Sequence, residues 1–298
     1  MSKTLYIIPD SGISGDMTVG ALLSLGADRT ALEKALSSIP ADGFKTLITQ
    51  VDKSGQTATD FDVILEIPNH DHDMHYLYDP DYREDAETHS EGHHDGHHGD
   101  RHDGCGEAGG DHDHEHGHHH DHHHGRNLAD VTEIINATDM TEGARSLALK
   151  IFGIIADAEA KAHETTVEQV HFHEVGAIDS IVDVIAAAVC IDSIGADRIV
   201  SLPLHEGCGR VRCQHGLLDV PVPAVKNIVE AYDLPLEIMG WQGEYVTPTG
   251  AAIVAAVSDE FITEEKFENI FQNKARVRGY GAGKREGQGT GLLTMVLA

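Results

Sequence analysis

Two groups of residues in this sequence have side chains of the kind that bind metal ions. The first is the stretch GGDHDHEHGHHHDHHHG, residues 109–125, which holds nine histidines. They are His112, His114, His116, His118, His119, His120, His122, His123 and His124. The second is the segment VHFHEVGAIDSIVD, which begins at Val170. Imidazole is mostly neutral near pH 7 and binds nickel, zinc, copper and iron, so both groups predict metal chemistry.

The histidine-rich stretch belongs to a longer polar segment, residues 69–126. Residues 70–124 hold eighteen of the 23 histidines and sixteen acidic residues, against two arginines. Such a segment cannot bury enough apolar surface to offset the entropy of ordering, so we predict a disordered insertion that attracts cations. A polar linker with inert histidines is the plain alternative, but histidine is scarce in ordinary linkers, which favours metal binding.

The segment VHFHEV predicts a fixed metal site if it is extended. His171 and His173 then point to one face and can chelate one ion, while Glu174 joins them from the following turn. Asp179 and Asp183 are four residues apart and share one face of the next helix. Alternatively, both histidines are hydrogen-bonded core residues and Asp179 is a helix N-cap. Spacing alone leaves both interpretations open.

The stretch SGISGDM near the start has the pattern of a turn before a helix. Ser11, Gly12, Ser14 and Gly15 offer backbone N–H groups there, which is a suitable cradle for a phosphate. The stretch is not a Walker motif, because the lysine and the following hydroxyl residue are absent. Asp16 is either a catalytic carboxylate or an acidic residue favoured by the helix dipole.

Three later loops add polar groups. The loop EGCGRVRCQHG carries Cys208 and Cys213, which are too far apart for a zinc knuckle but near enough for one pocket. The loop VTPTG offers the hydroxyls of Thr247 and Thr249, and GYGAGKREG offers backbone N–H groups, Lys284 and Arg285. Each loop can bind an anion, but each signal is weak by itself.

Composition limits the class of protein. The formal net charge of −29 in 298 residues argues against nucleic acid as a main partner. The chain has no run of eighteen apolar residues and no signal-peptide pattern, which predicts a cytoplasmic protein without a membrane span. Four cysteines without a CxxC pair predict free thiols.

Hydrophobic patterns predict interleaved strands and helices. Strands are expected in KTLYIIPD, KTLITQVDK, FDVILEIP, DRIVSLPL, KARVRGYG and GLLTMVLA, with extended backbone in VEQVHFHEV. Helices are expected in Met17–Leu25, Arg29–Leu36, LADVTEIINA, EGARSLALKIFGIIADAEAKAH, IDSIVDVIAAAVCIDSIG, Val225–Tyr232 and after Thr249. This order favours an α/β or α+β fold, a mixed sheet with flanking helices. We expect residues 1–68 to begin the folded region, residues 69–126 to form the insertion, and residues 127–298 to complete the fold.

Taken in order, SGISGDM, the insertion, VHFHEVGAIDSIVD, HGLLDVPVPA, VTPTGAA and GYGAG resemble the LarC family, the nickel insertases of nickel-pincer nucleotide cofactor biosynthesis. The resemblance covers nearly the whole chain. It implies a lyase-class enzyme, a chelatase or cyclometallase. Such an enzyme inserts Ni(II) into pyridinium-3,5-bisthiocarboxylic acid mononucleotide, forms Ni–C and Ni–S bonds, and hydrolyses CTP.

This sequence departs from the family pattern in two places. Members often carry an acidic residue in the first strand where this chain has Ile8, so a role for that acid is not transferred. Full-length members continue into a C-terminal domain associated with CTP and Mn(II) or Mg(II), whereas this chain stops at Ala298. The resemblance therefore implies a partner chain that carries that domain. A homo-oligomer is also expected, with no nucleic-acid or membrane partner.

Within the resemblance, the chemistry suggests roles for particular residues. Insertion at a ring C–H position needs delivery of Ni(II), loss of its water ligands and a base. The hypothesis is that the insertion collects nickel and passes it to His171 and His173. Glu174 or Asp179 is then the third ligand or proton acceptor, and the phosphate lies on SGISGDM or GYGAGK. Lesser candidates for the pocket wall are Thr247, Thr249 and His215.

Two other functions compete with this hypothesis. A non-catalytic nickel store or metallochaperone explains the histidines without a pocket, but it has no use for VHFHEVGAIDS and VTPTG. A zinc or manganese hydrolase acting on a nucleotide shares the two-histidine site but needs no thiol-bearing substrate.

Overall fold

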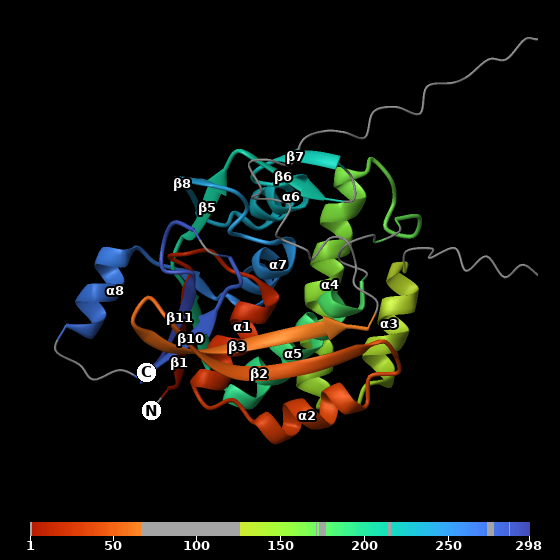
Figure 1. Cartoon of the computed structure of the whole chain (residues 1–298), viewed down its shortest axis with the longest axis horizontal. Coiled ribbons are helices and arrows are strands. Elements are labelled where there is room, and N and C mark those ends of the chain that lie inside the picture. The colour runs from red at the N-terminus through yellow and green to blue at the C-terminus, as the bar shows by residue number, and fades with distance from the viewer. Residues whose placement is uncertain are drawn as a thin grey trace, which may run out of the picture.

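The computed structural model describes residues 2–66, 126–170, 172, 177–213, 216–272, 277–285 and 287–298 (Figure 1). The helices are α1 (Gly15–Ser24), α2 (Arg29–Ser37), α3 (Leu128–Ala137), α4 (Glu142–Ala162), α5 (Ile178–Ile194), α6 (Pro223–Tyr232), α7 (Pro248–Val257) and α8 (Glu264–Phe271). The strands are β1 (Thr4–Ile8), β2 (Phe44–Lys53), β3 (Gln56–Leu65), β4 (Arg198–Ser201), β5 (Leu204–Cys208), β6 (Arg210–Cys213), β7 (Gly216–Asp219), β8 (Leu236–Gln242), β9 (Glu260–Phe261), β10 (Val277–Ala282) and β11 (Leu292–Leu297).

One mixed sheet forms the centre of the described chain. Its strand order is β2-β3-β10-β11-β1-β4-β9, in which β1 is antiparallel to β11 and parallel to β4. β2 and β3 form an antiparallel hairpin whose turn residues, Ser54 and Gly55, both have positive φ. Such two-residue turns match the twist of the strands that they join. The predicted fold class, a mixed sheet with flanking helices, is confirmed.

Helix α1 lies directly on the sheet, over β3, β10 and β11. Two glycines of GYGAG permit this close approach. A Cβ atom on Gly279 would lie 2.3 Å from the carbonyl oxygen of Ala21, and one on Gly281 would lie 1.9 Å from that of Met17. These two glycines therefore belong to strand β10 and its packing, and only the residues after Ala282 form a loop.

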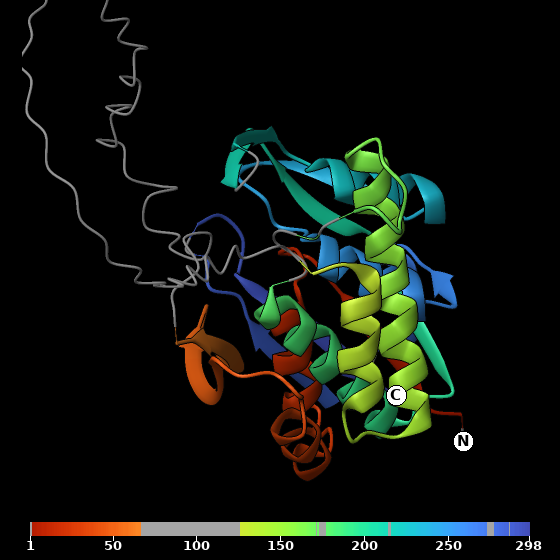
Figure 2. The same ribbon diagram turned by 90° about the vertical axis from the view of Figure 1, so that its right-hand side faces the viewer.

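Further helices cover both faces of the sheet. α5 packs on α1 and α4 packs on α5, while α3 and α4 stand side by side on the outside (Figure 2). On the opposite face, Phe267 and Phe271 of α8 contact Tyr6 of β1 edge-on, with ring centroids 5.5 and 5.1 Å away. None of the helices in the described ranges is both long and apolar enough to span a bilayer.

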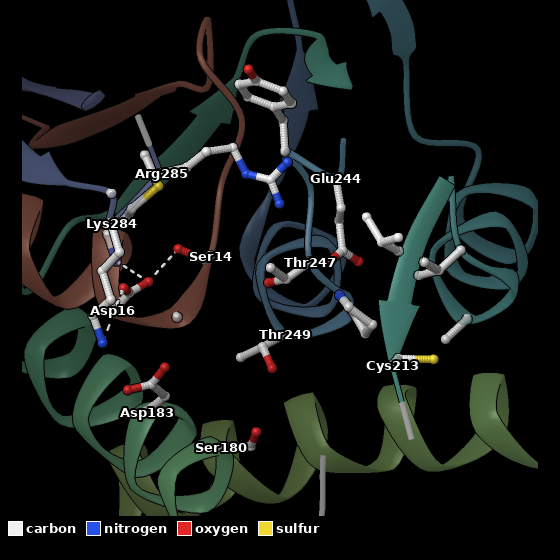
Figure 3. Close-up of a pocket in the computed structure, with 18 of the residues that line it drawn as sticks. Ser14, Asp16, Ser180, Asp183, Cys213, Glu244, Thr247, Thr249, Lys284 and Arg285 are labelled. Carbon is white, nitrogen blue, oxygen red and sulfur yellow. Dashed lines mark hydrogen bonds and ion pairs between the residues drawn. The ribbon is translucent and has the colours of Figure 1, made fainter. Parts of the chain in front are cut away.

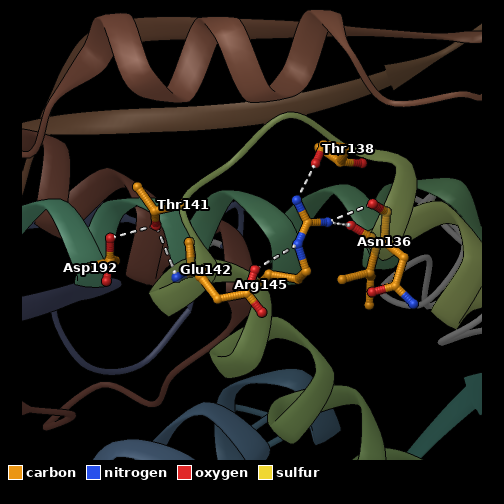
Figure 4. A network of polar contacts seen from close by, with 8 residues as sticks. Asn136, Thr138, Thr141, Glu142, Arg145 and Asp192 are labelled. Atoms are coloured by element: carbon orange, nitrogen blue, oxygen red, sulfur yellow. Dashed lines mark hydrogen bonds and ion pairs between the residues drawn. The ribbon is translucent and has the colours of Figure 1, made fainter.

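Arg145 of α4 joins the end of α3 to the rest of the fold (Figure 4). Its guanidinium donates to the carbonyl oxygens of Ile135 and Asn136 at 2.7 Å and to that of Thr138 at 3.0 Å. Ile135 and Asn136 belong to the last turn of α3 and Thr138 is its C-cap, so no further helical N–H is available to these carbonyls. The single side chain therefore completes the C-terminus of α3.

We expect Arg145→Met to lower the free energy of unfolding by about 2 kcal/mol, because three hydrogen bonds from a charged donor to the carbonyls at the end of α3 are lost. Urea denaturation measures the effect. The matched control is Arg29→Met, which removes an exposed ion pair with Glu33 and should cost much less. Equal losses in the two variants would contradict a special role for Arg145.

Most predicted elements are present, with shifted ends. Helix α5 ends as expected at Gly195, which has φ +60. The predicted extended backbone is wrong for residues 167–169, which form a turn in which the N–H groups of Gln169 and Val170 both donate to the Thr166 carbonyl. Helix α8 was not predicted from the sequence. The expected free thiols are found at Cys190, Cys208 and Cys213.

Candidate functional site

A cavity of about 750 Å³ lies where the N-termini of four helices meet (Figure 3). Its wall includes Ser14 and Gly15 of α1, Asp179 and Ser180 of α5, Val222, Pro223 and Ala224 at α6, and Thr247, Pro248 and Thr249 at α7. Helix N-termini carry unpaired N–H groups and a partial positive charge. This convergence makes the cavity suitable for an anionic ligand.

Of the four helices that begin at the cavity, α1, α5 and α6 lack a side-chain N-cap. Side chains that accept a backbone hydrogen bond cap α2, α3, α4, α7 and α8, and they belong to Asp28, Asn127, Thr141, Thr247 and Thr263. α5 and α6 follow Ala177 and Val222, whose side chains have no acceptor, and Ser14 does not cap α1. Within the described ranges, every helix without a side-chain cap therefore begins at this cavity.

A carboxylate of α5 already occupies the start of α1. A Cβ atom on Gly15 would lie 2.6 Å from Oδ2 of Asp183, and the Asp16 backbone N–H donates to the Asp183 carboxylate. The next amide, that of Met17, donates to Oδ1 of Asp16 at 2.8 Å, and Ser14 Oγ donates to the same oxygen. The first amides of α1 thus bind carboxylates of the chain itself.

The loops SGISGDM and VTPTG interlock although about 235 residues separate them. Ile13 and Val246 form a parallel bridge, in which the Ile13 N–H donates to the Tyr245 carbonyl at 2.9 Å. Gly12 has φ +85, and a Cβ there would lie 2.1 Å from the Tyr245 oxygen. A Cβ on Gly250 would lie 2.2 Å from the Ile13 oxygen. A side chain at either position would therefore clash with a backbone oxygen. Gly12 also has a positive φ, which favours glycine.

One end of the cavity gathers carboxylates around Lys284. The Lys284 ammonium donates to Asp62 Oδ1 and lies 4.0 Å from Asp16 Oδ2. Burial lowers the pKa of Lys284, but Asp16 and Asp62 outweigh it, so the pKa is raised and the side chain stays charged. Burial raises the pKa of Asp183 well above its usual range, and the neighbouring Asp16 raises it further. Asp183 is therefore a stronger base than an ordinary aspartate.

A thiol lies at the opposite end of the cavity. Cys213 at the end of β6 lies far from Asp16 and Lys284 (Figure 3). His163 and Glu159 of α4 also line the wall, with Nε2 and Oε2 separated by 3.6 Å. No three histidine, cysteine or acidic side chains in the described ranges lie close enough to hold one metal ion.

The structure brings some of the predicted site residues together. The cavity wall contains Ser11, Ser14, Gly15, Asp16, Asp179, Thr247, Thr249 and Lys284, and Gly12 lies behind it against Tyr245. Asp179 and Asp183 share one face of α5 as predicted, but the N-cap is Ala177 and not Asp179. Cys213 lines the cavity, whereas Cys208 does not.

Several predicted residues lie outside the described ranges. They are His171, His173, Glu174, His215, His112, His114, His116, His118, His119, His120, His122, His123 and His124. Of the segment VHFHEV, the structure describes Val170 and Phe172, and the Phe172 N–H donates to the Arg126 carbonyl at 2.9 Å. The proposed roles of these histidines and of Glu174 remain predictions.

Asp62 is a charged residue of the wall that was not predicted from the sequence, whereas Arg285 was named with Lys284 as a candidate for anion binding. Asp62 lies on β3, where it pairs with Lys284, and Arg285 stacks over the Tyr245 ring at 5.1 Å from its centroid. Asp183 was noted only as a neighbour of Asp179. The period of β3 could have suggested that Asp60 and Asp62 share a face, but only the fold shows that this face meets Lys284.

Comparison with known proteins identifies relatives over nearly the whole chain. The family model described as nickel insertion protein matches residues 5–298. A protein of Alkaliphilus metalliredigens named pyridinium-3,5-bisthiocarboxylic acid mononucleotide nickel insertion protein is 44% identical over 258 residues, which is 86% of this chain and 52% of that protein. No solved structure matches.

Two further relatives carry the same name. The protein of Acetivibrio thermocellus is 36% identical and is covered to 57%, and the protein of Clostridium acetobutylicum is 39% identical and is covered to 61%; each alignment includes 95% of this chain. This chain thus spans about half to three fifths of the length of these relatives. Because the family model matches all of this chain except residues 1–4, the chain belongs to the nickel insertion protein family.

Proposed function

We propose that this chain inserts Ni(II) into pyridinium-3,5-bisthiocarboxylic acid mononucleotide to form the nickel-pincer nucleotide. The observation that carries the proposal is the cavity at which every uncapped helix of the described ranges begins, with carboxylates at one end. A mononucleotide with two thiocarboxylates is an anion of the kind that such a cavity attracts. The names of the Alkaliphilus metalliredigens and Acetivibrio thermocellus proteins contain this mononucleotide.

The phosphate of this substrate is proposed to bind at the starts of α5 and α6. These helices have apolar N-cap residues, so their first amides lack a capping side chain. The start of α1, by contrast, is already neutralised by Asp183 and Asp16. Thr247 and Thr249 at α7 and Arg212 on β6 add hydroxyls and a cation to the same wall.

The carboxylates of α1 and α5 are proposed to accept the proton that the ring loses. Ni(II) replaces a ring hydrogen without a change of oxidation state, so one proton must leave as the Ni–C bond forms. Asp183 suits this role because its raised pKa makes it a stronger base than an ordinary aspartate. In addition, its Oδ1 has no hydrogen-bond partner in the described chain. Asp179, one turn earlier, is the alternative acceptor, and Glu174 remains a candidate ligand.

Nickel is proposed to reach this site from the histidine-rich insertion. Arg126, where the described chain resumes, is the backbone partner of Phe172. Phe172 is buried and packs edge-on against Phe152, so the pairing is anchored in the core. His124 precedes Arg126 by two residues, and His171 and His173 are the sequence neighbours of Phe172. This arrangement supports transfer of Ni(II) from the insertion to His171 and His173.

The remaining features of the proposal come from the family resemblance. They are dependence on CTP with Mn(II) or Mg(II), a partner chain that supplies the nucleotide site, a homo-oligomeric state, the lyase class and a cytoplasmic location.

Calorimetry of nickel binding tests the proposal. The intact chain and a variant lacking residues 70–124 are each titrated with Ni(II), with and without the pincer precursor. We expect the deletion to remove most nickel sites and to leave one site that requires the precursor. If all binding disappears with the deletion, the chain is a nickel store and the insertion activity is wrong.

Substitution of the paired histidines tests the transfer route separately. His171→Ala and His173→Ala should abolish the precursor-dependent site and leave the several sites of the insertion intact. His163→Ala, which changes a described cavity histidine on α4, is the matched control. If His171→Ala and His173→Ala transfer nickel to the precursor as well as the unmodified chain does, the fixed site is excluded.

A further inference from the structure

The hairpin turn between β2 and β3 reaches into a loop that contributes to the cavity wall. This loop, residues 283–291, carries the wall residues Lys284, Arg285 and Gln288. It contains four glycines and no apolar side chain. Such a loop loses much conformational entropy on ordering and gains no buried apolar surface. Its fixed shape therefore requires polar contacts from other regions of the fold.

Lys53, the last residue of β2, supplies the central contact. Its ammonium donates to the carbonyl oxygen of Gly283 and to that of Arg285, the latter at 2.9 Å. The two carbonyls flank Lys284 along the chain. At the other end of the loop, a Cβ on Gly291 would lie 2.5 Å from Lys53 Cε, so the lysine packs directly against this glycine. Lys53 thus passes between the two ends of the loop.

Weaker contacts close the loop around this lysine. Gly283 N–H donates to the Gly291 carbonyl at 2.9 Å, and Ser54 Oγ donates to the Thr290 carbonyl at 2.8 Å. Ser11 accepts a hydrogen bond from the Thr290 N–H at 2.8 Å. None of these contacts reaches the carbonyls beside Lys284. Among the contacts of the loop, that of the Lys53 ammonium joins the carbonyls on both sides of Lys284.

We infer that Lys53 is a positioning residue, which acts through the carbonyls of Gly283 and Arg285 to hold Lys284 and Arg285 in the cavity wall. Lys284 then meets Asp62 and Asp16, and Arg285 lies over Tyr245. Lys53 does not line the cavity itself. Its importance for ligand binding rests on the proposed function, but its hold on the loop does not.

Limited proteolysis tests the hold on the loop without any ligand. Trypsin cleaves after Lys284 and Arg285, and mass spectrometry identifies the C-terminal fragments. Lys53→Met should accelerate these cuts about tenfold, because the charged hydrogen bonds are lost. Lys53→Arg should restore protection, since a guanidinium can donate to both carbonyls. Lys45→Met, an exposed lysine on the same strand, should change nothing.

Binding of the pincer precursor tests the positioning role. Lys53→Met should raise the Kd for the precursor about tenfold, while Ni(II) binding by the histidine-rich insertion stays as in the intact chain. Lys53→Gln, which removes the charge and shortens the side chain but keeps a polar group, provides a milder variant if Lys53→Met does not fold. Cleavage of Lys53→Met at the rate of the unmodified chain overturns the inference. Accelerated cleavage with unchanged precursor affinity overturns the positioning role.

The two assays also separate this inference from the proposed function. If the unmodified chain does not bind the precursor, the proposed function is wrong. In that case the trypsin assay still decides whether Lys53 holds the loop.

Discussion

Alanine at Gly250 is expected to lower the free energy of unfolding by about 3 kcal/mol. The added Cβ would lie 2.2 Å from the Ile13 carbonyl oxygen, which is a backbone atom and cannot turn away. Ile13 is held on both sides, since its N–H donates to Tyr245 and its carbonyl accepts from the Thr247 N–H. The substitution must therefore separate α7 from the loop before α1, which also opens the cavity.

Gly153→Ala provides the matched comparison. Gly153 lies within α4, and an added Cβ there meets no atom within 4 Å. Because alanine favours the helix more than glycine does, this variant should gain about 0.5–1 kcal/mol. Urea denaturation of both variants gives the two free energies. If Gly250→Ala lowers the free energy of unfolding by no more than the magnitude of the change in Gly153→Ala, the two loops can move apart at little cost and the prediction is wrong.

Asp183→Asn is expected to be more stable than the unmodified chain at neutral pH, and this difference should shrink at acidic pH. The same substitution should strongly slow nickel insertion. Burial raises the native pKa of Asp183 above its unfolded value, so the native state binds the proton more tightly. The carboxyl therefore lowers the stability of the native state increasingly as the pH rises between these two pKa values. Asparagine carries no titrating proton, so the stability difference between variant and unmodified chain should grow over that interval.

The same substitution removes the proposed proton acceptor. Loss of a general base slows a reaction about 10²- to 10⁴-fold, so insertion by Asp183→Asn should fall by at least about 100-fold. Thermal unfolding at several pH values gives the first result, and formation of the nickel-pincer product gives the second. Asp157→Asn, an exposed change on α4, is the control. A stable variant that still inserts nickel would leave Asp179 as the acceptor.

Local sequence patterns were sufficient for most of the fold. The apolar run from Ile178 to Ile194, followed by glycine, predicts α5 because burial on all sides and a left-handed end leave few alternatives. Helix α8 was missed because only Phe267 and Phe271 of its residues are buried, so its apolar stripe is narrow. The turn at residues 167–169 was predicted to be extended because the segment VEQVHFHEV contains valines and a phenylalanine, which favour strands, whereas a turn follows the end of α4.

The site could be predicted only incompletely, because its electrostatics depend on contacts between distant segments. Asp16, Asp179, Thr247 and Lys284 were chosen individually, and the cavity joins them. No local pattern indicates that Asp183 reaches the amide of Asp16 or that Lys53 reaches the carbonyls beside Lys284. Likewise, the apolar N-caps Ala177 and Val222 indicate an anion-binding position only when the fold places the starts of α5 and α6 at one cavity.

The position of β1 has a consequence for the synthesis of the protein. β1 leaves the ribosome before the rest of the sheet, yet its neighbours are β4 and β11, and β11 ends at Leu297. Translation at roughly 5–20 residues per second keeps this apolar strand without its second neighbour for tens of seconds. The nascent chain therefore needs protection from aggregation, and neither the sheet nor the cavity can be completed before β11 emerges.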